Sequence, residues 1–298
     1  MKLLSIISVK DDLEVIGPAT QNRLAAGFDE VVIVAVEPSE EMAATAQALT
    51  RGDPRVRALA MAKPDAAGAF LSFTAEPMAT ILSGHPDWVL VSDADEFVVA
   101  ERPVAELPEL AGEAPLSVPR YNYARRRGEV PGEMAARLRD PACLPLIAER
   151  RQAFKDGVPV PGVRWLEHRI SPRPMFRPRT AARFDVGAHH LIGADGARQP
   201  TTPAVNLLMA HLPFTSFPRF SRKIDNVAAH LSDVAGVHAT TASHWKEWLK
   251  ARDGGRLGET FEAEAFSAEE FEARRAEGSI DTASGLFVRL KAGDKSVR

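Results

Sequence analysis

Three carboxylate residues follow a short apolar segment near the end of the first third of the chain. Residues 88–91 read Trp-Val-Leu-Val, a run typical of a strand that is buried on both faces of a sheet. Asp93, Asp95 and Glu96 come next, where such a strand would emerge at the C-terminal edge of the sheet, the edge at which open α/β sheets bind ligands. Because unpaired buried carboxylates are costly, we expect these side chains to face solvent or to hold a cation. The pattern predicts metal-assisted chemistry on a phosphorylated substrate.

The composition is typical of a globular protein. The chain has 298 residues, of which 45% are hydrophobic and 26% charged, enough for one large α/β domain or two smaller ones. The net charge of -3 provides no global field that would favour nucleic acid as a partner. Cys143 is the single cysteine, which excludes an internal disulfide and fits a reducing compartment.

The N-terminal segment predicts a strand rather than a signal peptide. The apolar run at residues 3–9 is short, lacks a small-residue cleavage site and is followed at once by three charged residues. No segment reaches the roughly 20 apolar residues that a membrane helix needs. We therefore expect a cytoplasmic protein without a transmembrane segment.

The first hundred residues alternate predicted strands with predicted helices. Ser39 is a suitable N-cap for the second helix, and Gly27 is a suitable stop for the first. Such alternation predicts right-handed crossovers and a mainly parallel sheet flanked by helices, which is typical of a nucleotide-binding half. The expected strands are 3–9, 30–36, 55–61 and the segment beginning at 88, and the expected helices are 13–26, 39–49 and 70–82.

Past residue 100 this regularity is lost. Proline is dense between residues 103 and 178, and residues 128–161 show no clear period, which is typical of a long functional loop. The charged stretch 259–277 predicts an exposed helix before a short apolar end at 285–290. The other expected elements are strands at 175–177, 185–192 and 205–211 and helices at 217–231 and 244–252.

The string Trp-Val-x-x-x-Asp-Ala-Asp-Glu-Phe at residues 88–97, placed after three strand–helix units, resembles glycosyltransferase family 2. It is most similar to the bacterial branch that carries this form of the DXD motif, and the resemblance extends over residues 1–100 with fragments at 173–190 and 205–226. It implies a GT-A-like α/β fold with an irregular α+β second half. The implied divisions are a nucleotide-sugar-binding half at 1–100, an acceptor-side half at 101–258 and a charged C-terminal helix or tail at 259–298.

The resemblance implies metal-dependent transfer of a sugar from a nucleotide diphosphate sugar to a hydroxyl of a glycan or glycolipid, with inversion, in polysaccharide biosynthesis. A divalent cation would neutralise the leaving diphosphate, and Mn²⁺ or Mg²⁺ suits oxygen ligands. By resemblance Asp95 binds the metal, Asp93 meets the ribose or a metal-bound water, and Glu96 accepts hydrogen bonds behind them. In a straight strand Asp93 and Asp95 would share one face. Peripheral contact with a membrane stays open.

The nucleotide sugar is expected at the ends of the first, second and fourth strands. Candidate donor-binding residues there are Lys10, Asp12, Glu37 and Asp93. Family members often have Lys-Asn-Glu at the position of residues 10–12, and a Ser-x-Asp turn where this chain has Glu-Pro-Ser-Glu. The identity of the nucleotide is therefore left unassigned.

Two histidines are further candidates for the same site. His189 ends a Gly-Ala-His sequence that resembles a Gly-x-His fragment of the family, and we expect it to ligate the metal, with structural packing as the alternative. His211 begins His-Leu-Pro-Phe-Thr-Ser, which resembles a His-x-Pro-x-Arg-Ser segment, and is a candidate for donor binding. Thr215 stands where relatives have the arginine.

The basic and aromatic residues give weaker signals. Arg177, from a series with Arg173 and Arg179, and Lys223 are candidates for binding the diphosphate, since guanidinium groups bind phosphate in a bidentate manner. The run at residues 125–127, Arg-Arg-Arg, is expected to be solvated. Two tryptophans at helical spacing are expected to pack in a core, Trp245 and Trp248.

Inversion requires a carboxylate base that removes the proton of the acceptor hydroxyl. Asp185 and Glu167, together with Asp140, are the candidates. A phosphatase of the haloacid-dehalogenase type also uses Asp-x-Asp after a strand, but that motif normally follows the first strand and has Thr or Val where Phe97 stands here. The second alternative is a non-catalytic module that binds nucleotide sugars or glycans, which the altered turn at residues 37–40 favours.

Overall fold

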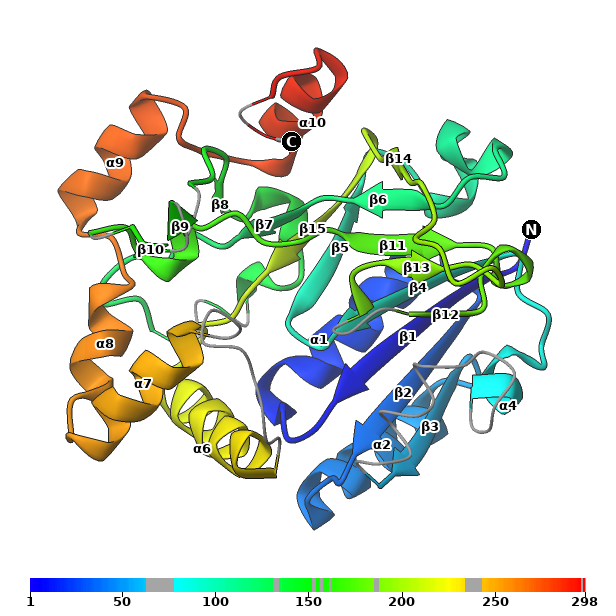
Figure 1. Ribbon diagram of the computed structural model, residues 1–298, viewed down its shortest axis with the longest axis horizontal. Helices are drawn as coiled ribbons and strands as arrows, with labels where there is room; N and C mark the ends of the chain where they lie inside the picture. The colour runs from blue at the N-terminus through cyan, green and yellow to red at the C-terminus, as the bar shows by residue number, and fades with distance from the viewer. Residues whose placement is uncertain are drawn as a thin grey trace. The chain divides into compact units, whose positions relative to one another are not determined.

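A seven-stranded sheet contains the four strands predicted in the first hundred residues (Figure 1). Its order is β14-β6-β11-β4-β1-β2-β3. The four predicted strands run parallel to one another, β11 is antiparallel to both β4 and β6, and β14 is parallel to β6. The central sheet is therefore mixed and mostly parallel. The bounds are β1 Leu3–Val9, β2 Glu30–Val36, β3 Val56–Met61, β4 Trp88–Asp93, β6 Leu116–Val118, β11 Arg173–Phe176 and β14 Thr202–Pro203.

The computed structural model describes residues 1–62, 78–130, 134, 136–151, 154–155, 158–160, 162–184, 188–233, 243–295 and 297. The chain divides into two units. Unit 1 consists of residues 1–120, 171–211 and 290–292 and contains the large sheet. Unit 2 consists of residues 121–170, 212–289 and 293–298.

The cap residues Gly27 and Ser39 lie where the sequence predicts, although α2 ends at Gly52 rather than at Leu49. Gly27, with φ +96°, follows the end of α1, and the Ser39 hydroxyl accepts a hydrogen bond from the Met42 N–H at 3.2 Å at the start of α2. The helix predicted at 70–82 is described from Met78 onward. The helical elements are α1 Leu13–Ala25, α2 Glu40–Gly52, α4 Met78–Leu82 and the 3₁₀ turns η1 Val104–Glu106, η2 Pro108–Ala111 and η5 Pro178–Thr180.

Apolar side chains cover both faces of the sheet. Val89 and Val91 of β4 pack on one face with the helix α4, whereas Trp88 and Leu90 pack on the other with residues 104–110. The period of two along a strand puts alternate side chains on opposite faces. Burial on both faces explains why β4 reads as a continuous apolar run.

Two short antiparallel pairs complete unit 1. β5 Glu96–Ala100 pairs with β15 Leu207–His211, and β12 Arg183–Phe184 pairs with β13 Leu191–Ile192. The prediction of one strand over 185–192 is wrong for its described part, because Ala188 has φ +54° and the strand begins at Leu191. Residues 185–187 lie outside the described part of the chain.

Unit 2 is mainly helical. The single exposed helix predicted over 259–277 is wrong: Ser267 caps a separate helix by accepting the N–H of Glu270 at 3.1 Å, and Phe261 and Phe271 are buried. The elements are α6 Phe217–Asp233, α7 Ser243–Asp253, α8 Leu257–Ala263, α9 Ala268–Ala276, α10 Ala283–Lys291, η3 Pro141–Cys143, η4 Trp165–Glu167, β7 Arg120–Asn122, β8 Leu146–Ile147, β9 Phe154–Lys155, β10 Val158–Pro159 and β16 Ile280–Asp281.

An aromatic cluster forms the core of unit 2. Trp248 is 6% exposed and meets Phe214 and Phe220 at ring-centroid distances of 5.3 Å each, and Trp245 packs against the same cluster. This confirms the prediction that the tryptophans of α7 serve core packing. Across the described ranges, each helix is too short or too polar to cross a bilayer.

His244 gives unit 2 an expected sensitivity to acid. Burial, and then the charges of His168 and Lys223, lower its pKa from 6.5 to about 4. Between these pH values the unfolded chain binds a proton that the folded chain does not, so stability should fall as pH drops from 6.5 toward 4. We expect His244→Phe to reduce the loss of unfolding free energy between pH 7 and pH 5, measured by urea unfolding. The control is His85→Gln, which replaces an exposed histidine and should leave this loss unchanged. An identical pH dependence in His244→Phe would contradict this assignment.

Candidate active site

The predicted donor-binding residues lie at one edge of the large sheet. In the parallel register Ser8 of β1 is opposite Asp93 of β4, and Val9 is opposite Ala35 of β2, so the C-terminal ends of these strands are level. Just beyond them, the Lys10 ammonium lies 3.9 Å from the Glu37 carboxylate. The structure therefore brings Lys10 and Glu37 together on the same edge as Asp93.

Asp12 also lies at this edge, between β1 and α1. Its carbonyl accepts the N–H groups of Val15 and Ile16 at 3.2 and 3.1 Å, which fixes the first turn of the helix. Glu37 has φ +44°, an uncommon conformation for a residue with a side chain. Backbone strain of this kind is often found at functional sites.

Asp93 and Asp95 differ sharply in exposure. β4 ends at Asp93, Ala94 and Asp95 form a turn, and β5 begins at Glu96. The side chain of Asp93 is 54% exposed, whereas that of Asp95 is 2% exposed. The expectation that the two aspartates share one face of a straight strand is wrong, because the strand ends before Asp95.

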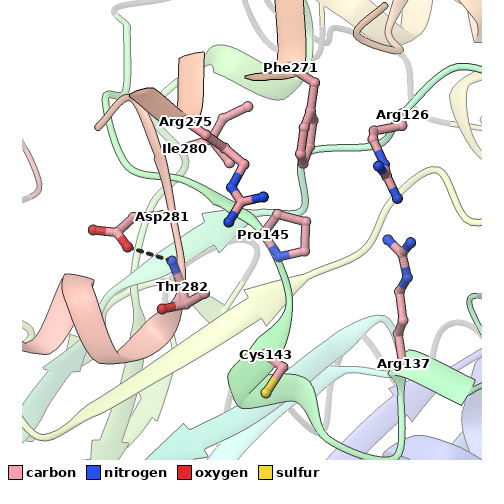
Figure 2. Close-up of a pocket in the computed structure, with 9 residues that line it drawn as sticks. All are labelled: Arg126, Arg137, Cys143, Pro145, Phe271, Arg275, Ile280, Asp281 and Thr282. Carbon is pink, nitrogen blue, oxygen red and sulfur yellow. Dashed lines mark hydrogen bonds between the residues drawn. The ribbon is translucent and has the colours of Figure 1, made fainter. Parts of the chain in front are cut away.

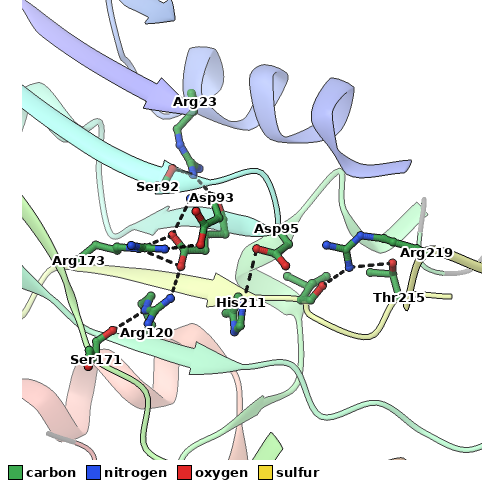
Figure 3. A network of polar contacts seen from close by, with 12 residues as sticks. Arg23, Ser92, Asp93, Asp95, Arg120, Ser171, Arg173, His211, Thr215 and Arg219 are labelled. Carbon is green, nitrogen blue, oxygen red and sulfur yellow. Dashed lines mark hydrogen bonds and ion pairs between the residues drawn. The ribbon is translucent and has the colours of Figure 1, made fainter. Parts of the chain in front are cut away.

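Glu96 is the centre of a buried ion-pair cluster. Its partners Arg120 and Arg173 are labelled in Figure 3. Its carboxylate is fully buried, pairs with Arg120, and accepts from Arg173 Nε at 2.9 Å and from the N–H of Asp93 at 3.1 Å. Burial raises the pKa of Glu96, but the charges of Arg173 and Arg120 outweigh it and hold that pKa far below its usual range. Glu96 thus stays ionised and closes the turn that carries Asp95.

The two arginines are themselves held in place. Arg173, on β11, also pairs with Asp93, and these carboxylates keep its pKa raised despite burial. Arg120 Nε donates to the carbonyl of Ser171 at 2.5 Å. The guanidinium groups of Arg120 and Arg173 lie against the carboxylates of Asp93 and Glu96. These two carboxylates therefore have less capacity to bind a further cation.

A third arginine reaches the turn from helix α1. Arg23 is fully buried and donates to the Ser92 hydroxyl at 2.9 Å and to the backbone carbonyl of Glu96. Burial lowers its pKa to about 10, so it stays charged at neutral pH. The neighbouring Asn22 accepts the N–H of Val98 at 2.7 Å and donates to its carbonyl at 2.9 Å. Helix α1 therefore fixes the start of β5.

Two histidines accompany these carboxylates. His211 is opposite Glu96 in the β5–β15 pair, and its Nε2 lies 3.7 Å from Asp95 Oδ1. Burial, and then the charges of Arg173 and Arg120, lower the pKa of His189 to about 3, so its ring is neutral at physiological pH. Among the described residues, none forms a hydrogen bond with the buried Nδ1 of His189. A neutral ring nitrogen without a partner could ligate a metal ion.

The predicted metal ligands suit an open cation site rather than a closed one. Within the described ranges, no three His, Cys, Asp or Glu side chains converge on a common point. Mg²⁺, however, is usually bound by one or two carboxylates together with substrate phosphates, and Mn²⁺ accepts the same oxygen ligands. The buried carboxylate of Asp95 could therefore hold a cation that arrives with a phosphorylated ligand, whereas Asp93 is already paired with Arg173.

Arg177 is the predicted residue that the structure separates most clearly from the carboxylates. Its guanidinium donates to the carbonyls of Leu110 and Gly112 at 3.2 Å and stacks over the ring of Trp88 at 4.7 Å. Trp88 begins β4, whereas Asp93 ends it. Because β11 runs antiparallel to β4, Arg173 rather than Arg177 lies beside the carboxylates of Asp93 and Glu96.

Two other candidates belong to unit 2. Glu167 is 4% exposed at its side chain and is paired with three arginines: Arg274 at 3.1 Å, Arg164 at 3.6 Å and Arg151 at 3.8 Å. Lys223 lies over the ring of Trp245, 5.8 Å from its centroid. Asp185 lies outside the described residues. Glu167 is therefore committed to ion pairs within unit 2, and the catalytic base is left unassigned.

Comparisons with known proteins add little to this geometry. No protein-family model matches the sequence, and no curated protein matches it. Solved structures that are similar include the WbbM bifunctional glycosyltransferase, with 17% identity and a TM-score of 0.26 over 40% of this chain and 23% of that one. Another is the mannosyltransferase PcManGT from Pyrobaculum calidifontis in complex with GDP-Man and Mn²⁺, with 14% identity and a TM-score of 0.37 over 98% of this chain and 79% of that one. The chain spans about a quarter of the length of WbbM.

Proposed function

We propose that this protein is a metal-dependent, GT-A-like glycosyltransferase that moves a sugar from a nucleotide diphosphate sugar to a hydroxyl of a glycan or glycolipid, with inversion. The observation that carries the proposal is the buried Asp95 in the turn after β4, at the sheet edge that also holds Lys10, Glu37 and Asp93. The resemblance of residues 88–97 to glycosyltransferase family 2 supports the same chemistry.

The residues divide into supporting and ligand-facing groups. Glu96 and its partners Arg120, Arg173 and Arg23 support the turn that carries Asp95. A bound Mn²⁺ or Mg²⁺ would be held by Asp95, and would neutralise the charge of the leaving diphosphate. Asp93, which is half exposed, would meet the ribose or a metal-bound water, and His211 Nε2 lies 3.7 Å from Asp95 Oδ1.

The test is the release of nucleoside diphosphate from a panel of nucleotide sugars. Purified protein is incubated with Mn²⁺, one nucleotide sugar at a time and a mixture of oligosaccharide acceptors. The nucleoside diphosphate released is then measured. We expect release from one donor, enhanced by acceptor. Binding of a donor without any release would instead favour the non-catalytic module. The proposal is rejected if no donor binds and no nucleoside diphosphate is released.

Nucleotide binding is expected to depend on a divalent ion. A diphosphate at this edge would meet the carboxylates Asp93 and Asp95, while Arg120 and Arg173 are already paired with acids. Without a cation the like charges repel, so affinity should fall by tenfold or more, roughly the effect of losing a charged hydrogen bond. Calorimetry of UDP, GDP and dTDP with Mn²⁺ or with EDTA measures it. Equal affinity in EDTA would contradict the metal-bridged site.

A further inference from the structure

Unit 2 contains a pocket that the proposed glycosyl transfer does not use. Its volume is about 300 Å³, within the range of small-molecule sites. Every residue that lines it belongs to unit 2 (Figure 2). The lining combines three arginines with an apolar wall and a thiol: Arg126, Arg137, Arg275, Phe271, Pro145, Ile280, Cys143, Asp281 and Thr282.

The guanidinium groups of Arg126 and Arg137 point toward one another in this pocket (Figure 2). Arg137 is held from behind, because its Nη1 donates to the Tyr123 hydroxyl at 2.8 Å and lies 2.6 Å from a carboxylate oxygen of Glu129. Arg126 stacks over the Phe271 ring at 5.2 Å. Two facing cations repel each other, so an anion between them would be stabilising.

Glu129 balances the charge of Arg137, so among the described residues the unbalanced charge of this pocket belongs to Arg126 and Arg275. Through the described part of the chain, no carboxylate forms an ion pair or hydrogen bond with Arg126. Arg275 has Glu272 at 3.7 Å, but both side chains are more than half exposed and such a pair is weak. Among the described residues, the Arg126 side chain therefore adds a positive charge that no carboxylate neutralises.

The one carboxylate in the lining is committed elsewhere. Asp281 accepts the N–H of Thr282 at 2.7 Å. Its oxygens also lie against Gly285 of α10, where a Cβ would be only 2.1 Å from them. The Asp281 carboxylate therefore contacts the N-terminal turn of α10, and in Figure 2 it is directed away from the arginines. The backbone around Arg126 is fixed too, since the N–H of Arg127 donates to the carbonyl of Phe266 at 2.8 Å.

We infer that this pocket binds a phosphate-bearing ligand of sugar-phosphate size, with the phosphate between Arg126 and Arg137 and the remainder against Phe271 and Pro145. A guanidinium group can bind two oxygens of one phosphate at once. The rings of Phe271 and Pro145 suit the apolar face of a sugar. The phosphate can belong to a free sugar phosphate or to a phosphorylated glycan. This inference is independent of the proposed transfer chemistry, because it concerns unit 2 alone.

Calorimetry on the full chain tests the site with glucose 6-phosphate, inorganic phosphate, a phosphorylated oligosaccharide and neutral glucose. We expect at least one of the two phosphorylated sugars to bind and neutral glucose not to bind. The phosphorylated sugar with the higher affinity indicates whether the natural ligand is a free sugar phosphate or a phosphorylated glycan. Arg126→Gln should weaken binding roughly tenfold or more, as loss of a charged hydrogen bond does. Arg127→Gln removes the same charge from an exposed neighbour outside the pocket and should leave affinity unchanged.

The rate at which Cys143 is alkylated reports on this pocket specifically, because Cys143 is the single cysteine and its side chain is exposed in the lining. Saturating phosphorylated ligand should slow alkylation of Cys143 several-fold in the unmodified protein, glucose should not, and Arg126→Gln should remove the protection. The inference is overturned if no phosphorylated probe binds, if Arg126→Gln and Arg127→Gln bind equally well, or if bound ligand leaves the alkylation rate unchanged. These outcomes are separate from nucleoside diphosphate release, so failure of one proposal does not decide the other.

Discussion

Replacing Asp95 with asparagine is expected to remove sugar transfer without unfolding the protein. Asparagine keeps the shape of this buried side chain but loses the negative charge that would hold the cation. Charge stabilisation of a leaving group is commonly worth a factor of about 10² to 10³ in rate, and we expect a loss of at least that size. Release of nucleoside diphosphate at saturating donor measures the effect.

Stability of the Asp95→Asn protein should stay near that of the parent. Asp95 follows Asp93 and precedes Glu96, and like charges so close destabilise one another when no metal is present. The control is Asp87→Asn, which makes the same change just before the opposite end of β4, where the side chain is 44% exposed. Full turnover by Asp95→Asn would show that this turn does not hold a catalytic metal.

The sequence predicted most of unit 1 because its signals are local. The first two strands have the predicted bounds, and the helix caps at Gly27 and Ser39 are where the pattern placed them. Short apolar runs, helix caps and strand–helix alternation are properties of neighbouring residues. The parallel register then follows, since strands joined by helices must run in the same direction. The edge that carries Lys10, Glu37 and Asp93 could therefore be named from sequence.

The arginines that support the site could not be assigned in this way. Arg120 and Arg173 are 24 and 77 residues from Glu96 in the chain, and no local pattern fixes such a contact. Arg23 left a signal that the sequence reading missed: it lies on the buried stripe of α1 with Val15, Ile16 and Ala19. A charged residue on an apolar stripe requires a buried partner.

Replacing Glu96 with glutamine is expected to cost more stability than any exposed substitution in the chain. Glutamine fills the same volume but leaves Arg120 and Arg173 as buried charges without an ionised partner at Glu96. Breaking a buried ion pair by removing one member typically costs about 3 to 5 kcal/mol. Urea unfolding at pH 7 measures the change. The control is Glu113→Gln, whose carboxylate pairs with Arg179 at 2.7 Å but is 66% exposed, and which should change stability by less than about 1 kcal/mol.

The pH dependence separates this ion-pair effect from a packing defect. The pKa of Glu96 is lower in the folded chain than the 4.5 of an unperturbed glutamate, so the folded state binds fewer protons than the unfolded state below that pH. The stability contributed by the charged carboxylate is therefore present above about pH 4.5 and is lost as pH falls further. We expect the difference between the parent and Glu96→Gln to be largest near pH 7 and to shrink below pH 4.5. A large difference that stays constant across this range would show that Glu96 acts through shape rather than charge, and a loss below about 1 kcal/mol at pH 7 would show that the arginines find other partners.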